Sequence, residues 1–204
     1  MGGGIYAWNS NLELTNNILW ANEATSDGDA VVIYEAGTVS IWYSDIDGGQ
    51  EAIWDDAGGL IWGNGNIDEQ PEFASYDIST EHDMWDFHLQ SEFGRWDKNI
   101  DDWVEDSTTS LCIDAGDPNT DYSGELWPHG GRINMGAYGG TRQASKNGNV
   151  ADFDINGSVD SVDLSEFVYY WLAEDGGIVN LNLKGVVNTE DFAILSENWL
   201  WEKE

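Results

Sequence analysis

Short apolar runs separated by turn residues occupy the first half of the chain. The runs are GIYAW, LELTNNILW, AVVIY, TVSIWYS, GGLIW and MWDFHL, with Gly, Asn and Asp between them at uneven intervals. Their Ile, Val, Trp and Tyr residues favour strands. A sandwich and a solenoid both fit this texture. We favour a parallel β-solenoid, in which successive turns of chain stack their apolar positions and Asn or Gly occupies the corners.

A helical pattern replaces the strand pattern in the last quarter of the chain. In SVDLSEFVYYWLAE the apolar residues recur at the spacing of one helix face, and NTEDFAILSENWLW repeats the pattern. The first predicted face comprises Leu164, Phe167, Val168, Trp171 and Leu172, and the second comprises Phe192, Leu195, Trp199 and Leu200.

These patterns divide the chain into three parts. Residues 1–98 are the predicted coils of the solenoid. Residues 99–146 are irregular and broken by Gly, Pro and Asp, so we interpret them as a cap over the open end of the coils. Residues 147–204 begin with a short polar linker and form the helical module.

An internal duplication relates the two helical segments and the loops before them. A shift of 28 residues (185 − 157) places Gly157 on Gly185 and Asp163 on Asp191. The same shift superposes two valines, two tryptophans and two leucines, namely Val159 on Val187, Trp171 on Trp199 and Leu172 on Leu200.

The loop before the first helix has oxygen-bearing side chains at the spacing of an EF-hand calcium loop. It reads DFDINGSVDSVD, with Gly157 at the sixth position, where the sharp turn requires glycine. An acidic turn that caps the helix is the alternative, and Asp160 and Asp163 would suit it. The agreement of the whole spacing favours calcium. The predicted Ca²⁺ ligands are Asp152, Asp154, Asn156, the carbonyl of Ser158, Asp160 and Asp163.

The second loop keeps the spacing and loses the charge. Its corresponding positions are Asn180, Asn182, Lys184, Val186, Asn188 and Asp191, of which only Asp191 is anionic. Calcium affinity rises with ligand charge, so this degenerate loop is predicted to bind weakly or not at all. One hypothesis is that the Lys184 ammonium partly replaces the ion; simple decay of a spare site is the other.

The charge balance narrows the classes of partner. The chain has 204 residues, with 39 Asp and Glu against 7 Lys and Arg, for a net charge of −32. This excess argues against nucleic acids and anionic membrane surfaces. Its single cysteine, Cys112, excludes an intrachain disulfide. Neither a signal peptide nor a membrane-spanning run is visible, and we expect the C-terminal part of a longer exported protein.

Residues 151–204 resemble a type I dockerin, because they carry two loop–helix repeats with Asp at the twelfth loop position. The resemblance implies an extracellular or cell-surface protein that docks onto a cohesin-like domain. It also implies partner contacts at loop positions ten and eleven, which are Ser161, Val162, Thr189 and Glu190. The phrases TNNILWAN, YSDIDGG, CIDAGDP and GGRINMGAYGG resemble the last coils of secreted, pectate-lyase-like right-handed parallel β-helix proteins.

The expected fold is therefore mostly β: the C-terminal coils and cap of a right-handed parallel β-helix, followed by a small all-α dockerin-like module with two EF-hand-type loops. The expected function is calcium-dependent attachment of a β-helix scaffold to a cohesin-type partner, in polysaccharide binding or breakdown. A polysaccharide-degrading glycoside hydrolase, or its non-catalytic C-terminal fragment, is the first alternative. A β-helix surface adhesin is the second.

Catalytic residues are not assigned. Residues 1–94 contain no Lys or Arg, which disfavours β-elimination by a polysaccharide lyase. A glycoside hydrolase needs two carboxylates, and three pairs are candidates, although turn formation is the favoured role for each. His82 and His88 lie near acids and could form a proton-transfer or metal constellation, but scattered histidines such as these and His129 are interpreted as structural. Exposed Trp side chains beside the coils could stack on sugar rings; core packing with some surface positions is the favoured interpretation. The pairs are Asp45/Asp47, Asp55/Asp56 and Asp68/Glu69; the tryptophans are Trp8, Trp20, Trp42, Trp54 and Trp62.

Overall fold

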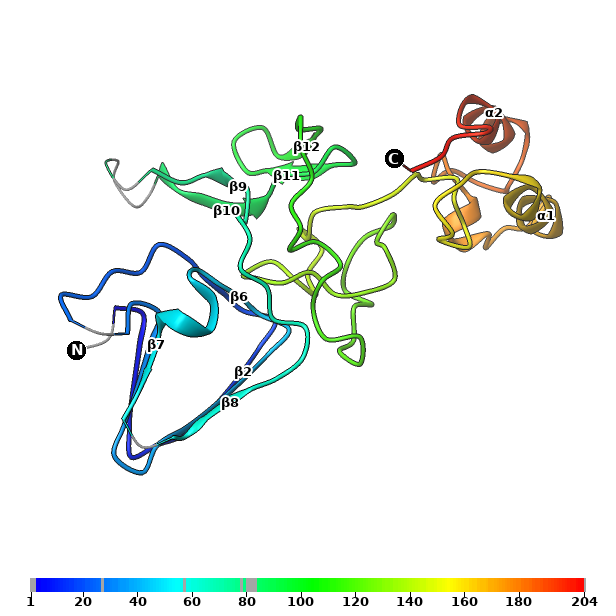
Figure 1. The fold of residues 1–204 in the computed structure, drawn as a ribbon. Helices are drawn as coiled ribbons and strands as arrows, with labels where there is room; N and C mark the ends of the chain where they lie inside the picture. The colour runs from blue at the N-terminus through cyan, green and yellow to red at the C-terminus, as the bar shows by residue number, and fades with distance from the viewer. Residues whose placement is uncertain (1–2, 27, 57, 78, 80–83, 204) are drawn as a thin grey trace.

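The computed structural model describes residues 3–26, 28–56, 58–77, 79 and 84–203. Three regions follow one another along the chain (Figure 1): stacked short sheets near the N-terminus, an irregular body in the middle and a two-helix unit at the C-terminal end. Throughout, the body means residues 73–146 and the two-helix unit means residues 147–203.

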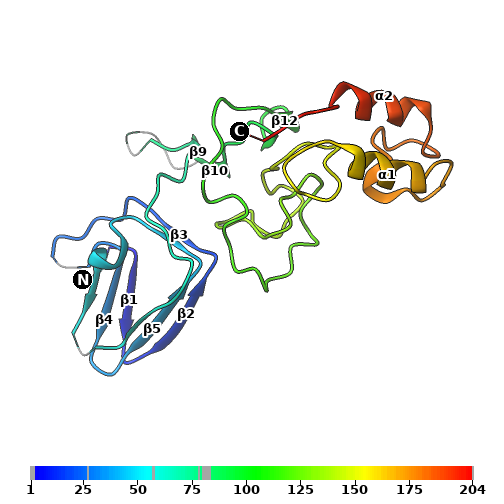
Figure 2. The same cartoon turned by 45° about the vertical axis from the view of Figure 1, so that its right-hand side comes forward.

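Three short parallel sheets form the N-terminal stack, and Figure 2 shows their strands side by side. Each sheet takes one strand from each successive turn of the chain. The first contains β1 (Ile5–Trp8), β4 (Val31–Tyr34) and β7 (Ile53–Asp55). The second contains β2 (Asn11–Thr15), β5 (Thr38–Trp42) and β8 (Leu60–Trp62), and the third contains β3 (Ile18–Leu19) and β6 (Asp45–Ile46).

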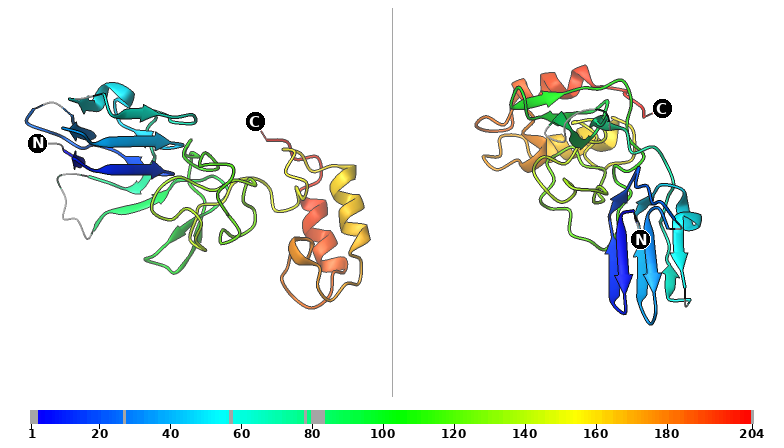
Figure 3. Two further views of the ribbon diagram at one scale, coloured as in Figure 1. Left: turned by 90° about the horizontal axis from the view of Figure 1, so that it is seen from below. Right: turned by 90° about the vertical axis from the view of Figure 1, so that its left-hand side faces the viewer.

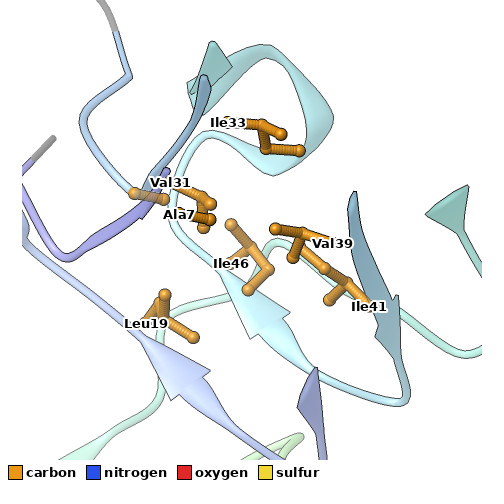
Figure 4. Packing of buried hydrophobic residues seen from close by; sticks show 8 residues of the cluster. Ala7, Leu19, Val31, Ile33, Val39, Ile41 and Ile46 are labelled. Atoms are coloured by element: carbon orange, nitrogen blue, oxygen red, sulfur yellow. The ribbon is translucent and has the colours of Figure 1, made fainter. Parts of the chain in front are cut away.

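Small and β-branched side chains fill the interior between these sheets. Their alternation along β5, where Val39 and Ile41 are buried and their neighbours are not, is the period-two pattern of a strand with one buried face. Parallel register places like positions over one another, as with Leu19 and Ile46. Figure 4 shows the labelled side chains converging from different strands: Ala7, Leu19, Val31, Ile33, Val39, Ile41 and Ile46.

Parallel pairing ends shortly after β8, at the isolated parallel bridge between Asp45 and Ile67. Gly63 lies so close to the Trp42 ring that a Cβ would fall 2.0 Å from it, and Gly65 has a left-handed φ of 76°. Pro71 then removes a backbone donor. The strands that follow pair antiparallel: β9 (Phe73–Ser75) with β10 (Asp86–Leu89), and β11 (Arg95–Asp97) with β12 (Asp102–Val104).

The expected right-handed parallel β-helix is therefore wrong. The parallel sheets are two or three strands wide, and the described chain continues into antiparallel pairs and irregular segments instead of a long parallel β-helix. The physical reason lies beyond the parallel bridge at Ile67, where Pro71 removes a backbone donor and the chain leaves the stack.

The two helices of the C-terminal unit are α1 (Ser161–Tyr169) and α2 (Thr189–Glu197), and η3 (Gly177–Val179) lies between them. Each helix begins with a capping box, formed by Asp160 with Asp163 and by Asn188 with Asp191. Figure 3 shows the helices side by side. They lie where the sequence predicts helices, but each is only nine residues long.

The expected all-α dockerin-like module is also wrong. Leu172 and Leu200 were placed on the predicted helix faces, but both lie beyond the helix ends, with left-handed φ angles of 67° and 64°. Their backbone N–H groups donate to Val187 and Val159 of the opposite repeat, at 2.9 and 3.0 Å. Residues predicted to extend the helices thus form cross-repeat backbone pairs, and loops make up much of the unit.

Candidate metal centre

Three carboxylates of the first loop converge. Oxygens of Asp152, Asp154 and Asp163 all lie within 4.8 Å of one another. Asp152 is 5% exposed, Asp163 is fully buried and Asp154 is exposed, so the cluster opens to solvent on one side. Carboxylate oxygens at this spacing suit a hard divalent cation.

Backbone amides of the turn hold Asp152 in place. Its carboxylate accepts from the N–H of Asn156 at 3.1 Å and from the N–H of Gly157 at 2.9 Å. Gly157 has a φ of 88°, which favours glycine, and Ile155 adopts a left-handed φ of 58°. The chain therefore curls around the carboxylate, as the glycine at the sixth position predicts.

Asp163 joins the loop to the helix. Its carboxylate accepts from the N–H of Phe153 at 2.6 Å and from the N–H of Asp160 at 2.8 Å. The side chain of Asp160 instead accepts from the N–H of Val162 at 2.7 Å, as the N-cap of α1. Of the predicted ligands, Asp160 therefore has the capping role that the alternative interpretation gave it, and it lies outside the three-carboxylate cluster.

Asn156 and Ser158 complete the rim of the loop. The amide of Asn156 donates to Asp154 at 2.9 Å, and its oxygen accepts from the N–H and the hydroxyl of Ser158 at 2.9 and 2.7 Å. These bonds bring the Asn156 side chain to the cluster, as predicted for the fifth loop position.

In the part of the chain that the structure describes, no basic side chain pairs with the cluster. None of the ion pairs found among the described residues involves Asp152, Asp154 or Asp163. Burial, with the charges of Asp163 and Asp154 as a smaller cause, raises the pKa of Asp152 above its ordinary value, against the lowering effect of its backbone hydrogen bonds. Like charges at this spacing repel by about 1–3 kcal/mol per pair. A divalent cation would turn that repulsion into attraction.

The second loop repeats the backbone geometry without the charge. The N–H of Lys184 donates to Asn180 at 3.1 Å and to Asn182 at 2.8 Å, which matches the bonds of Asn156 to Asp152 and Asp154. Leu183 and Gly185 have the left-handed φ angles of Ile155 and Gly157. Lys184 is exposed, and its hydrogen bonds to Asn180 and Asn182 come from its backbone N–H. The duplication therefore extends to the backbone, while the acids of the first loop are replaced by amides.

The predicted partner contacts lie at the N-terminal ends of the helices. Ser161, Val162, Thr189 and Glu190 are all exposed there. Further exposed apolar residues lie on the same unit: Val168 at 60%, Tyr169 at 80%, Leu172 at 63%, Leu183 at 84% and Leu200 at 71%.

Of the candidate catalytic carboxylates, Asp47, Asp55 and Asp68 accept hydrogen bonds from backbone amides. Asp55 accepts from the N–H groups of Gly58, Gly59 and Leu60, and Asp68 accepts from Gly48. Asp47 accepts from Ala21. Each of these bonds closes a turn or joins neighbouring turns of the stack, which is the role favoured from the sequence.

Two buried polar pairs were not found from the sequence. The Asp45 carboxylate accepts from the Cys112 thiol at 3.1 Å, and burial raises the pKa of Asp45 to about 6. His88 Nδ1 lies 2.5 Å from Asp86, and its ring stacks on Tyr138. His129 packs edge-on against Trp127, and His82 lies outside the described residues. Cys112 and Tyr138 are distant in sequence from Asp45 and His88, so no spacing signals these two contacts, whereas Asp86 lies only two residues before His88.

An aromatic-lined cavity of about 730 Å³ lies between the first turn of the stack and the β9–β10 pair. Trp20 belongs to the tryptophans singled out in the sequence, whereas Tyr76, Trp85 and Phe87 were missed. Aromatic residues recurring two positions apart at Trp85 and Phe87 were the available signal. The lining also includes Phe73 and the amides of Asn17 and Asn22.

Comparison with known proteins identifies no relative. No protein-family model matches the chain, and neither a curated protein nor a solved structure is significantly similar to it. Among the described residues, no helix is both long and apolar enough to cross a membrane. The function therefore has to be argued from the site itself.

Proposed function

We propose that the chain is a calcium-binding attachment protein whose first C-terminal loop holds one Ca²⁺. The observation that carries this proposal is the convergence of Asp152, Asp154 and Asp163 within 4.8 Å, with no ion pair to any of them among the described residues. Asn156 and backbone carbonyls of the loop supply further oxygens of the kind that calcium prefers. The second loop, with Asp191 as the only acid at its ligand positions, stays empty at the same calcium concentration.

The surface of the two-helix unit supports the proposed role in attachment. Tyr169, Leu172 and Leu200 expose apolar area on the two-helix unit, and Leu200 is bonded to Val159 of the first loop, whose order depends on calcium. The partner to test first is a cohesin-type protein domain, contacted through Ser161, Val162, Thr189 and Glu190. An extracellular or cell-surface location follows from this proposal, because calcium is abundant there.

Calorimetric titration of the full chain with calcium tests the proposal. We expect one site per chain and a gain in thermal stability on binding. Two sites would contradict the assignment of the second loop, and no heat of binding would end the calcium proposal. Magnesium serves as the control ion, because it demands a more rigid octahedral site and should bind more weakly.

Glycan binding is a second candidate, favoured by the cavity lined by Trp20, Tyr76, Trp85 and Phe87. Aromatic faces with nearby amides suit the apolar faces and hydroxyls of a sugar. Titration with a panel of soluble polysaccharides tests this candidate. Tryptophan fluorescence of the wild-type protein and of Trp20→Ala monitors binding. Binding that survives Trp20→Ala unchanged would exclude this cavity.

A further inference from the structure

The last residues of the chain touch both the calcium loop and the body. The C-terminal tail, defined as residues 200–203, runs back from α2 toward the body in Figures 1 and 2. The tail contacts the loop through one set of interactions and the body through another. Gly157 is one of the loop residues that it contacts.

On the loop side, the tail pairs with the backbone beside the carboxylate cluster. Val159 N–H donates to Trp201 at 2.9 Å, and Lys203 N–H donates to Gly157 at 2.8 Å. The N–H of the same Gly157 donates to the Asp152 carboxylate at 2.9 Å. Gly157 therefore links the predicted calcium ligand Asp152 to the tail. Its N–H donates to the Asp152 carboxylate, and its carbonyl accepts from the N–H of Lys203.

On the body side, the tail meets Phe93 and Asn147, the latter at the start of the linker. The Trp201 ring lies edge-on to Phe93, with centroids 6.1 Å apart. The Lys203 ammonium lies 5.8 Å from the Phe93 ring and donates to the Asn147 side chain at 2.8 Å. Asn147 is itself fixed, because its amide donates to the half-buried Asp114 carboxylate at 2.5 Å.

This contact is sparse enough to open and close. A cavity of about 610 Å³ lies between the two surfaces, bounded by Glu92, Phe93 and Leu111 on the body and by Trp201 and Lys203 on the tail. One aromatic pair contributes about 0.5–1.5 kcal/mol beyond the area it buries. A modest change in the order of the loop can therefore shift the balance between docked and undocked tails.

We propose that the tail is a calcium-responsive latch that sets how the two-helix unit is held against the body. The proposal rests on the calcium binding proposed above. Calcium draws the Asp152 carboxylate and the Gly157 peptide into one arrangement, Gly157 fixes the backbone of Lys203, and Trp201 and Lys203 are held on Phe93 and Asn147. Undocking exposes the aromatic faces of Phe93 and Trp201.

Because calcium binding and tail docking are thermodynamically linked, the latch can be measured through calcium affinity or through docking of the tail. If calcium favours the docked tail, then the docked tail must raise calcium affinity by the same factor. Phe93→Ala removes the aromatic contact from the body side and leaves every residue of the loop and tail intact. Lys203→Ala is the second variant; it removes the bond to Asn147 and keeps the backbone bond to Gly157.

The experiment combines calcium calorimetry with hydrogen exchange on the full chain. In the wild type, we expect calcium to slow exchange both at Val159 and Lys203 and in the peptide spanning residues 91–96. In Phe93→Ala and Lys203→Ala, calcium affinity falls about two- to tenfold at unchanged stoichiometry. Residues 91–96 then no longer respond to calcium. Ile100→Ala, an exposed body residue, is the matched control and should match the wild type.

The outcomes separate the latch from calcium binding. If the wild type binds calcium and protects Val159, but residues 91–96 do not respond and both variants keep wild-type affinity, the latch is wrong and the calcium site stands. If the wild type gives no heat of binding, calcium binding fails and the latch falls with it. A variant that fails to fold shows lost circular dichroism, and the other variant then decides.

Discussion

The N-terminal stack and the two-helix unit are held together by different kinds of interior. The stack buries an apolar cluster that includes Val31, Ile33, Val39 and Ile41, all at 0% exposure. The two-helix unit has a smaller apolar cluster around Phe167 and also buries the carboxylates of Asp152, Asp163 and Asp191. Hydrophobic burial is therefore the main stabilising contribution in the stack. The stability of the two-helix unit depends on what neutralises its acids.

Two buried aspartates, one in each region, show this difference in how acids are neutralised. Asp45, in β6 of the stack, accepts a hydrogen bond from Cys112 of the body, and burial raises its pKa to about 6, so a proton can neutralise it. Asp152, in the first loop, shares its site with two more carboxylates and has no basic partner. A cation is the species that neutralises all three together. Three changes test this division.

The largest expected effect comes from the core of the stack. Ile41→Ala leaves a cavity in the central strand of the β2–β5–β8 sheet and should lower the free energy of unfolding by about 2–5 kcal/mol. Urea denaturation measures the loss. Ile61→Ala, at a 49% exposed position of the neighbouring strand, is the matched control and should cost less than about 1 kcal/mol. Equal losses for the two variants would show that the stack has no specific core.

The next effect is on calcium binding. Asp152→Ala removes a ligand and the acceptor that organises the turn, so calcium affinity should fall by at least about 100-fold. Asn180→Ala makes the corresponding change in the second loop and should leave affinity unchanged. Calorimetry of both proteins is the measurement. An equal loss in Asn180→Ala would mean that calcium binds the second loop or depends on both loops together.

The smallest effect is a pH dependence in the stack. Because the folded-state pKa of Asp45 is raised from 3.8 to about 6, its contribution to stability is fully present below about pH 3.8 and is lost as the pH rises through about 6. Asp45→Asn removes this titration. Between pH 5 and pH 7.5, the stability of D45N relative to the wild type should rise by about 1 kcal/mol. Parallel pH dependences of the two proteins would show that Asp45 does not titrate in this range.

Local spacing accounts for what could be predicted of the candidate site. The turn glycine, Asp152, Asp154 and Asp163 lie within twelve consecutive residues, so their proximity follows from the loop itself. Asp160 shows the limit of spacing. A ligand position and an N-cap position coincide there, and the backbone of α1 decides in favour of the cap.

The fold was harder to predict than the candidate site, because pairing between residues far apart in the sequence decides it. Short β-rich runs predict strands equally well in parallel and antiparallel sheets, and the change of pairing after β8 depends on where the chain turns next. Similarly, apolar residues at helical spacing predicted helices through Leu172 and Leu200. Backbone bonds to the opposite repeat end both helices earlier.

The sequence alone determined the duplication, the positions of the two helices and the acid-rich first loop, because each of these depends on residues within a few turns of one another. Only the tertiary structure decided the extent of the parallel stack, the pairing of Asp45 with Cys112 and the aromatic cavity. It also decided the contact of Trp201 with Phe93. These features join residues separated by tens of positions, and packing and desolvation across that distance leave no periodic trace in the chain.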